Sequence, residues 1–164
     1  ARAAGDSVGG VLETAALGVP AGVGEPWFSS VESVLSAALF AIPAVKGVEF
    51  GDGFALCDRR GSEANDPFRM AGAQVVTVTN HNGGVNGGIT NGMPVIFRTA
   101  VKPTPTIGRE QETVDFAAGA DTTLQGKGRH DPCIVHRARV VVDNVTALVL
   151  ADLLAGRYGT DWLA

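Results

Sequence analysis

Residues 80–92 have an unusual composition, because five of these thirteen residues are glycine and four are asparagine. Glycine lets backbone N–H groups approach an anion without a Cβ in the way, so the segment could form a concave site for phosphate or carboxylate. The glycine spacing matches neither a P-loop nor a dinucleotide-binding motif. A long β-hairpin loop explains the same composition equally well. We expect His81 to be a hydrogen-bonded structural residue rather than a catalyst.

A second segment, Gly-Lys-Gly-Arg-His-Asp-Pro-Cys at residues 126–133, places two cations close to a carboxylate. The guanidinium of Arg129 suits bidentate binding of a phosphate or a carboxylate. Asp131 precedes a proline, which is typical of a helix N-cap, and the helix dipole would keep this carboxylate ionised. An ionised carboxylate beside a ligand can also accept a proton. The potential metal ligands here are His130, Cys133 and His136, but they lack the spacing of a metal site, so no metal is expected.

Basic residues are concentrated in one part of the chain. Seven of the thirteen are Arg98, Lys102, Arg109, Lys127, Arg129, Arg137 and Arg139. The chain as a whole has a formal net charge of −4, which is the wrong balance for a protein that holds nucleic acid by neutralising phosphates. The cluster therefore indicates a small anionic ligand, although solvated surface charge is the simpler explanation for Arg109, Arg137 and Arg139 individually.

Length and composition limit the classes of protein. The 164 residues fit one domain, and we expect residues 1–164 to form a single domain. A charged fraction of 18% beside an apolar fraction of 45% indicates a folded chain whose surface is partly covered by another segment or subunit. The longest apolar stretch is too short to cross a membrane. The two cysteines form no disulfide framework, so a cytoplasmic location is expected. Because the chain starts without methionine, we expect a fragment of a longer protein.

The hydrophobic pattern mixes strands and helices without strict alternation, which favours an α+β fold with antiparallel pairs. Strands are expected at residues 9–20, 45–50, 74–79 and 93–101, and a loop at 61–70. Ser29-Ser30-Val31-Glu32 fits a capping box, and the apolar spacing after it predicts a helix over residues 31–42. A second helix at 140–154, stopped by Gly156, is apolar nearly all round and should be buried or packed on another subunit. Prolines make residues 102–106 stiff and extended.

Six motifs, in this order, resemble those of the chorismate synthase family. They are Gly5-Asp6-Ser7-Val8-Gly9-Gly10, the run Ile-Pro-Ala-Val-Lys-Gly-Val-Glu at 42–49, Gly-Asp-Gly-Phe at 51–54, Asn80-His81 with the two glycine pairs, Lys102-Pro103-Thr104, and Gly-Arg-His-Asp-Pro-Cys at 128–133. The resemblance covers nearly the whole chain but only the C-terminal half, or slightly less, of the family. The part with the family's two catalytic histidines is absent, and no histidine of this chain replaces them. The resemblance implies the C-terminal portion of a β-α-β sandwich that assembles as a homotetramer.

The family resemblance also implies an activity. It is a lyase of the shikimate pathway of aromatic amino acid biosynthesis, which converts 5-enolpyruvylshikimate 3-phosphate to chorismate by 1,4-anti elimination of phosphate. Reduced FMN is the implied cofactor, with NADPH as its reductant, directly or through a separate reductase. Carried over by position, the FMN contacts are Pro43, Ala44, Gly87, Lys102, Pro103, Thr104, Pro105, Thr106 and Arg129. Arg129 is also implied to face the substrate, and Asp131 is implied to take the proton on from the flavin.

Two alternatives to a catalytic fragment stay open. One is a flavin- or phosphate-binding module without catalysis, which the absent histidines favour. The other is a structural self-association domain, which predicts concentration-dependent oligomers and no ligand binding. Because the family's pocket draws residues from both halves of the protein, we expect this chain alone to have no lyase activity.

Overall fold

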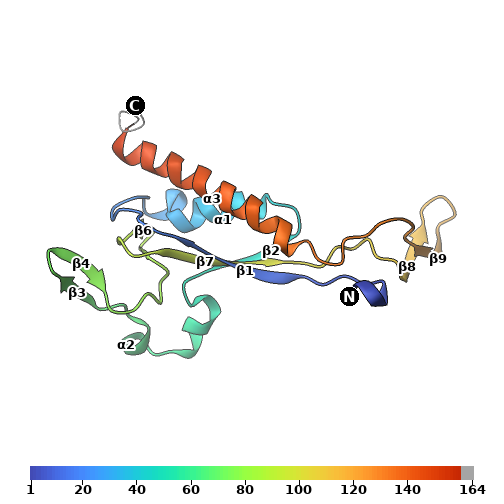
Figure 1. Ribbon diagram of the computed structural model, residues 1–164, viewed down its shortest axis with the longest axis horizontal. Helices are drawn as coiled ribbons and strands as arrows, with labels where there is room; N and C mark the ends of the chain where they lie inside the picture. Colours follow the sequence, from blue (N-terminus) through green and yellow to red (C-terminus); the bar gives the residue numbers. More distant parts are fainter. Residues whose placement is uncertain (160–164) are drawn as a thin grey trace.

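The computed structural model describes residues 1–159, and its centre is a three-stranded sheet. The strands β1 (Gly10–Ala16), β7 (Val95–Val101) and β2 (Val45–Phe50) lie in the order β1-β7-β2, and both pairs are antiparallel. The helices α1 (Val31–Phe40) and α3 (Val135–Tyr158) pack on one face of this sheet (Figure 1). The α+β fold with antiparallel pairs is therefore confirmed.

The core forms between the helices and one face of the central strand. Alternate residues of β7 are buried, and Val95 and Phe97 are fully enclosed. They pack with Leu35 and Leu39 of α1 and with Val142 of α3. Each such side chain contributes about 1.5–3 kcal/mol by leaving water. The alternation therefore fixes which face of the sheet carries the helices.

Helix α1 begins one residue later than the predicted capping box requires. Ser30 is the N-cap, and its hydroxyl accepts a hydrogen bond from the backbone N–H of Ser33 at 3.0 Å. The predicted capping box at residues 29–32 is wrong, because a capping box needs Glu at the third helical position and Glu32 stands at the second. The helix ends at Phe40, before the proline that limited the predicted range.

Helix α3 is longer than the sequence predicts. It begins at Val135 after Ile134, which supplies no side-chain cap, so the prediction that Asp131 is its N-cap is wrong. It also continues through Gly156 to Tyr158. One side of α3 packs on α1 and β1, whereas Val140, Val141 and Leu148 are exposed. Within residues 1–159, α3 is therefore buried on one side only, whereas the sequence predicted an apolar helix that is buried or packed on another subunit.

Short elements extend from this core. Before β2 and after it come η1 (Arg2–Ala4), η2 (Trp27–Ser29), η3 (Gly53–Asp58) and α2 (Gly61–Ala64). Three hairpins follow, β3 (Phe68–Ala71) with β4 (Gln74–Thr77), β5 (Val85–Asn86) with β6 (Ile89–Thr90), and β8 (Glu110–Asp115) with β9 (Ala120–Gln125). The predicted loop at 61–70 is wrong in part, since it contains α2 and the start of β3. No helix of the described residues is long and apolar enough to cross a membrane.

Candidate functional site

The two segments that could bind an anion lie at opposite ends of β7. The glycine segment adjoins the start of the strand, where the backbone N–H of Ile96 donates to the carbonyl of Gly83. Lys102 directly follows the last residue of the strand, and the 126–133 segment lies beside it. A seven-residue strand rises about 3.3 Å per residue, so roughly 20 Å separates the two ends. Figure 1 shows β6 and β8 at these opposite ends.

The glycine segment folds as the β5–β6 hairpin, with Gly87 and Gly88 as its two-residue turn. Both have positive φ, 59° and 88°, as a tight turn matching the twist of the strands requires. A Cβ on Gly83 would collide with the backbone nitrogen of Gly51 and the carbonyl oxygen of Ile96. At Gly87, by contrast, nothing lies within 4 Å of where a Cβ would be. Most of this composition therefore serves close packing, and Gly87 faces open space.

Asp66 holds the beginning of this segment in place. Its buried carboxylate accepts hydrogen bonds from the Thr79 hydroxyl at 2.7 Å and from the backbone N–H groups of His81 and Asn82 at 2.7 and 2.9 Å. Burial alone would raise the pKa of Asp66, but the three hydrogen bonds outweigh it and hold that pKa below its usual value. The ring of His81 lies 2.6 Å from Asp52, so His81 has the structural surroundings expected of it.

A cavity of about 570 Å³ lies beside the hairpin turn. Trp27, Glu32, Asn82, Asn86 and Gly87 are among its lining residues, and none of the lining residues comes from the 102–106 or 126–133 segments. Burial raises the pKa of Glu32. This cavity has polar edges and an aromatic side chain but no cation.

The opposite end of β7 brings four separate parts of the chain together, at Ser7, Ala44, residues 102–104 and Asp131. The N–H of Lys102 donates to the carbonyl of Ala44 at 2.8 Å. The Thr104 hydroxyl donates to the carbonyl of Asp131 at 2.9 Å, and the Ser7 hydroxyl donates to the carbonyl of Thr104 at 2.6 Å. Ala44 has a φ of 73°, a conformation that non-glycine residues rarely adopt. The stiff 102–106 strip is thus fixed from both sides.

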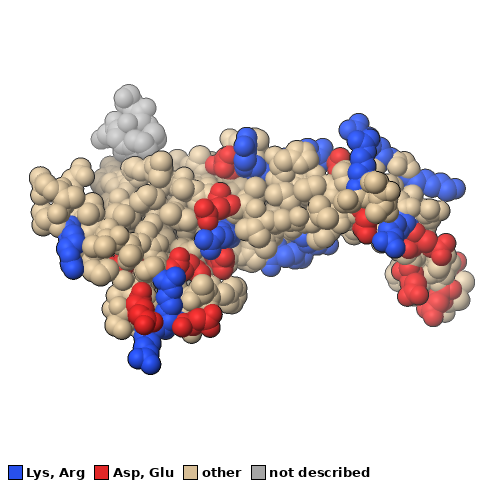
Figure 2. Space-filling view, turned by 60° about the horizontal axis from the view of Figure 1, so that its bottom comes forward, with Lys and Arg blue, Asp and Glu red and all other residues tan. Residues whose placement is uncertain are grey.

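Positive charge at this end is largely unneutralised. Nine cations have no ion pair within residues 1–159, and four of them lie between positions 102 and 139: Lys102, Lys127, Arg129 and Arg139. Arg109 pairs with Asp6 at 3.1 Å, and the pKa of Asp6 is lowered by the backbone N–H of Ser7 and by Arg109. Figure 2 shows Lys and Arg side chains gathered at the end that carries β8 and β9, next to the acidic side chains of that hairpin.

The carboxylate of Asp131 is partly engaged. Its Oδ2 accepts a hydrogen bond from Arg137 at 2.6 Å, whereas Oδ1 has no hydrogen-bond partner among the described residues. The side chain is 39% exposed, so a ligand can reach it. A carboxylate with one free oxygen, beside unpaired cations, can accept a proton from an anionic ligand bound there.

The structure brings together most of the residues implied to contact FMN, but not all of them. Pro43, Ala44, the 102–106 strip and Asp131 are gathered by the contacts given above, and Arg129 lies two residues before Asp131. Gly87 lies about 20 Å away, at the other end of β7. Sequence reasoning missed Ser7, although it belongs to a quoted motif. It also treated Arg137 as solvated charge, because a contact six residues apart along the chain leaves no periodic signal.

This end of the molecule fits a phosphate-bearing cofactor better than a metal. Unpaired ammonium and guanidinium groups, with the Thr106 hydroxyl on a stiff strip, match the charge and hydrogen-bonding needs of a phosphate. In the part of the chain that the structure describes, no group of three or more His, Cys, Asp or Glu side chains gathers as metal ligands would.

Comparison with known proteins gives one consistent result. A family model described as chorismate synthase matches residues 1–155. The chorismate synthase of Thermococcus kodakarensis is 54% identical over 157 residues, which are 96% of this chain and 44% of the relative. That of Opitutus terrae is 55% identical over 151 residues, 92% of this chain and 41% of the relative. A crystal structure of chorismate synthase matches with a TM-score of 0.77 at 35% identity, covering 96% of this chain and 40% of that one.

Proposed function

This chain belongs to the chorismate synthase family, and we propose that it forms the C-terminal part of a lyase that eliminates phosphate from 5-enolpyruvylshikimate 3-phosphate to give chorismate. Its fold is part of that family's fold. The chain spans about two fifths of the length of the curated relatives it matches, 44% and 41% in the two cases above. The activity is therefore proposed for the whole protein, in the cytoplasm and within aromatic amino acid biosynthesis.

One observation carries this proposal, the unneutralised positive charge beside the 102–106 strip. The chain is acidic overall, yet Lys102, Lys127 and Arg129 have no ion pair at this end. Water solvates these charges in the free protein, and together they can bind a multiply charged anion. Both the proposed substrate and FMN are phosphate esters. The cations would bind these phosphates and stabilise the negative charge that grows on a departing phosphate.

FMN is the proposed cofactor, and the residues of this end would hold it. Lys102 and Arg129 would neutralise its phosphate, while the Thr104 and Thr106 hydroxyls and the backbone near Pro43, Ala44, Pro103 and Pro105 would line it. Bound in its reduced form, FMN would supply electron density that assists phosphate departure, with no net redox change. NADPH would be the source of the reducing electrons.

Asp131 is the proposed proton acceptor of this chain. Its Oδ1 has no partner within residues 1–159, and its backbone is fixed by the Thr104 hydroxyl. The elimination breaks a C–H bond and a C–O bond to phosphate, and the proton must leave the site. Asp131 would take that proton on Oδ1.

Gly87 has a different position in this proposal. Its open side faces the cavity lined by Trp27 and Glu32, roughly 20 Å from Lys102. It would therefore contact a distant part of the same ligand or a ligand held at an interface between subunits. This is consistent with a homo-oligomer, proposed here as a tetramer, and with an isolated chain that is inactive as a lyase.

The test is FMN binding and turnover with the chain alone and with the preceding part of a curated relative added. FMN fluorescence should be quenched by the chain at micromolar to millimolar concentrations, and chorismate should form only when the two parts are combined. Turnover by the chain alone at the rate of a full-length relative would contradict the proposed incompleteness. Absence of FMN binding in both samples would contradict the proposed site.

A second candidate function is a flavin- or phosphate-binding module without catalysis. It is favoured by the completeness of the 102–106 and 126–133 cluster, which is held together by hydrogen bonds within this chain. In that case the chain would still quench FMN fluorescence, but no chorismate would form after the preceding part of a relative is added. Concentration-dependent oligomers without FMN binding would instead indicate a self-association domain.

A further inference from the structure

We propose that Arg137 is shared between Asp131 and the anionic ligand: it pairs with Asp131 in the free protein and transfers to the ligand's phosphate on binding. This inference rests on the proposed function, because it assigns a positioning role for the same site. It concerns a residue whose sequence context predicts no more than surface charge.

The position of Arg137 is not explained by the stability of its helix. Arg137 is the third residue of α3, in the first turn, where the helix dipole is positive and disfavours a cation. A positively charged side chain at this position costs stability unless an anion compensates for it. Asp131 supplies that anion in the free chain, through the 2.6 Å contact between Nη2 and Oδ2.

The contact is easily exchanged. The side chain of Arg137 is 65% exposed, and within residues 1–159 its one hydrogen bond runs from Nη2 to Asp131. An exposed ion pair of this kind stabilises a protein very little. A phosphate offers more charge and can bind the planar guanidinium through two parallel hydrogen bonds. Transfer of the arginine from carboxylate to phosphate is therefore favourable once a phosphate is nearby.

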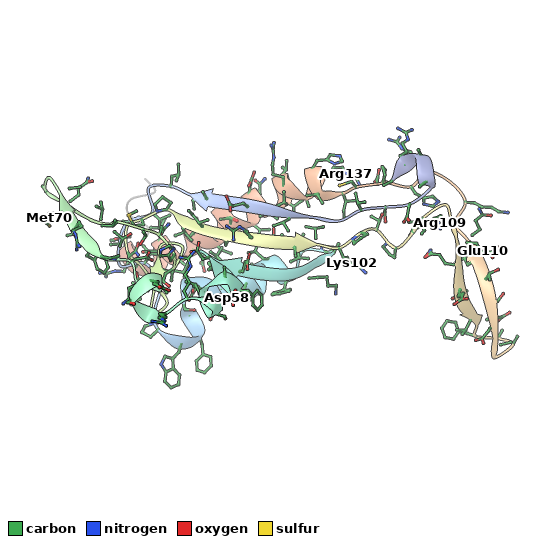
Figure 3. All side chains as sticks on the ribbon, turned by 90° about the horizontal axis from the view of Figure 1, so that it is seen from below. Asp58, Met70, Lys102, Arg109, Glu110 and Arg137 are labelled. Atoms are coloured by element: carbon green, nitrogen blue, oxygen red, sulfur yellow. The ribbon has the colours of Figure 1, made fainter. Side chains whose placement is uncertain are left out.

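The anion site lies within reach of this guanidinium. The backbone carbonyl of Asp131 accepts a hydrogen bond from Thr104, and the side chain of Asp131 accepts one from Arg137. The guanidinium of Arg137 therefore lies close to the 102–106 strip. Figure 3 shows Lys102 and Arg137 on the same half of the molecule, on the side of Arg109 and away from Met70. On transfer, Asp131 would lose its counter-ion at the moment when the proposed reaction needs a proton acceptor.

The test is a double-mutant cycle on binding, measured at about 0.15 M salt with inorganic phosphate and FMN titrated separately. D131N should tighten binding about two- to fivefold, because it frees Arg137, and R137Q should weaken binding about tenfold. The gain from D131N should disappear when R137Q is also present. It should persist alongside R139Q, a matched control that removes an unpaired cation two residues further along α3. R137K should retain part of the coupling.

The outcomes separate this proposal from the proposed function. An equal gain from D131N with and without R137Q would overturn the sharing of Arg137, while FMN binding in the same samples would leave the flavin site standing. Coupling with phosphate but no binding of FMN would support the sharing and overturn the flavin site. Failure of every variant to bind either anion would overturn both. Circular dichroism of each variant shows whether it is folded. If R137Q does not fold, R137K takes its place in the double-mutant cycle.

Discussion

The two ends of β7 look similar in sequence and differ in structure. Each combines glycines with polar residues and could bind an anion. At the Gly83 end the glycines are packed against backbone, and the nearby carboxylate of Asp66 accepts three hydrogen bonds from the chain itself. Of the nine cations without an ion pair in residues 1–159, four come from the 102–139 stretch at the Lys102 end. Unsatisfied charge, rather than glycine content, distinguishes a candidate ligand site from a packing element.

The largest expected effect separates two glycines of the 80–92 segment, Gly83 before the β5–β6 hairpin and Gly87 in its turn. G83A should destabilise the protein by more than about 3 kcal/mol, because the new methyl group meets the backbone of Gly51 and Ile96, neither of which can move freely. G87A should cost only about 1 kcal/mol, since the space around it is open and the cost comes from its positive φ. Urea denaturation of both variants checks this comparison. Equal losses would contradict the distinction between packing and open positions.

The next effect concerns Asp66. D66N should destabilise the protein by about 2 kcal/mol at pH 7, because an amide cannot accept all three hydrogen bonds. Since folding lowers the pKa of Asp66, its contribution is complete above the ordinary value of 3.8 and is lost as the pH falls through the lowered one. Denaturation at several pH values should therefore show the difference between wild type and D66N shrinking below about pH 4.

A matched control for this measurement is D58N, which changes an exposed aspartate at the end of η3. It should leave the stability within about 0.5 kcal/mol of the wild type. If D66N proved as mild as D58N, the glycine segment would not depend on Asp66 for its position.

Cation removal should affect binding and leave stability nearly unchanged. K102Q and R129Q should each weaken FMN binding about tenfold, because each removes a charge-assisted contact to phosphate. R69Q, which removes a cation from the β3–β4 hairpin, should change FMN affinity less than about twofold. Fluorescence quenching gives the affinities. A loss from R69Q as large as that from K102Q would show a nonspecific effect of net charge.

The smallest expected effect is that of Glu32, in the cavity at the glycine end. Burial raises its pKa, so the ionised form is penalised in the folded protein at neutral pH. E32Q should therefore raise stability at pH 7 by about 0.3 kcal/mol and should have no effect near pH 3, where the carboxyl is protonated in both the folded and the unfolded state. A stabilisation that is the same at both pH values would contradict this cause.

Local patterns predicted the central elements well. A helix was expected at 31–42 from its apolar spacing and a strand at 93–101, and the structure has α1 and β7 within two residues of these bounds. The β8–β9 hairpin was not predicted, because its residues are nearly all exposed and carry no alternation. Asp131 fits the pattern of an N-cap, but its backbone is held by Thr104, and the helix starts later. Such tertiary contacts leave no signal in the local sequence.

The candidate site was predictable as a set of residue types but not as an arrangement. Resemblance to the family pointed to Lys102, Arg129 and Asp131, and their proximity depends on hydrogen bonds between segments up to 97 positions apart, such as Ser7 to Thr104. The separation of Gly87 from these residues has two causes. The length of β7 was predicted from the sequence, whereas the packing of the β5–β6 hairpin at its start was not.

The most direct test of the account is to locate bound FMN on this chain by chemical-shift perturbation of its backbone amides. The largest shifts are expected at Lys102, Thr104, Arg129 and Asp131, with smaller changes in the β5–β6 hairpin. Shifts confined to the hairpin and the cavity beside Trp27, with none at Lys102 or Arg129, would contradict it.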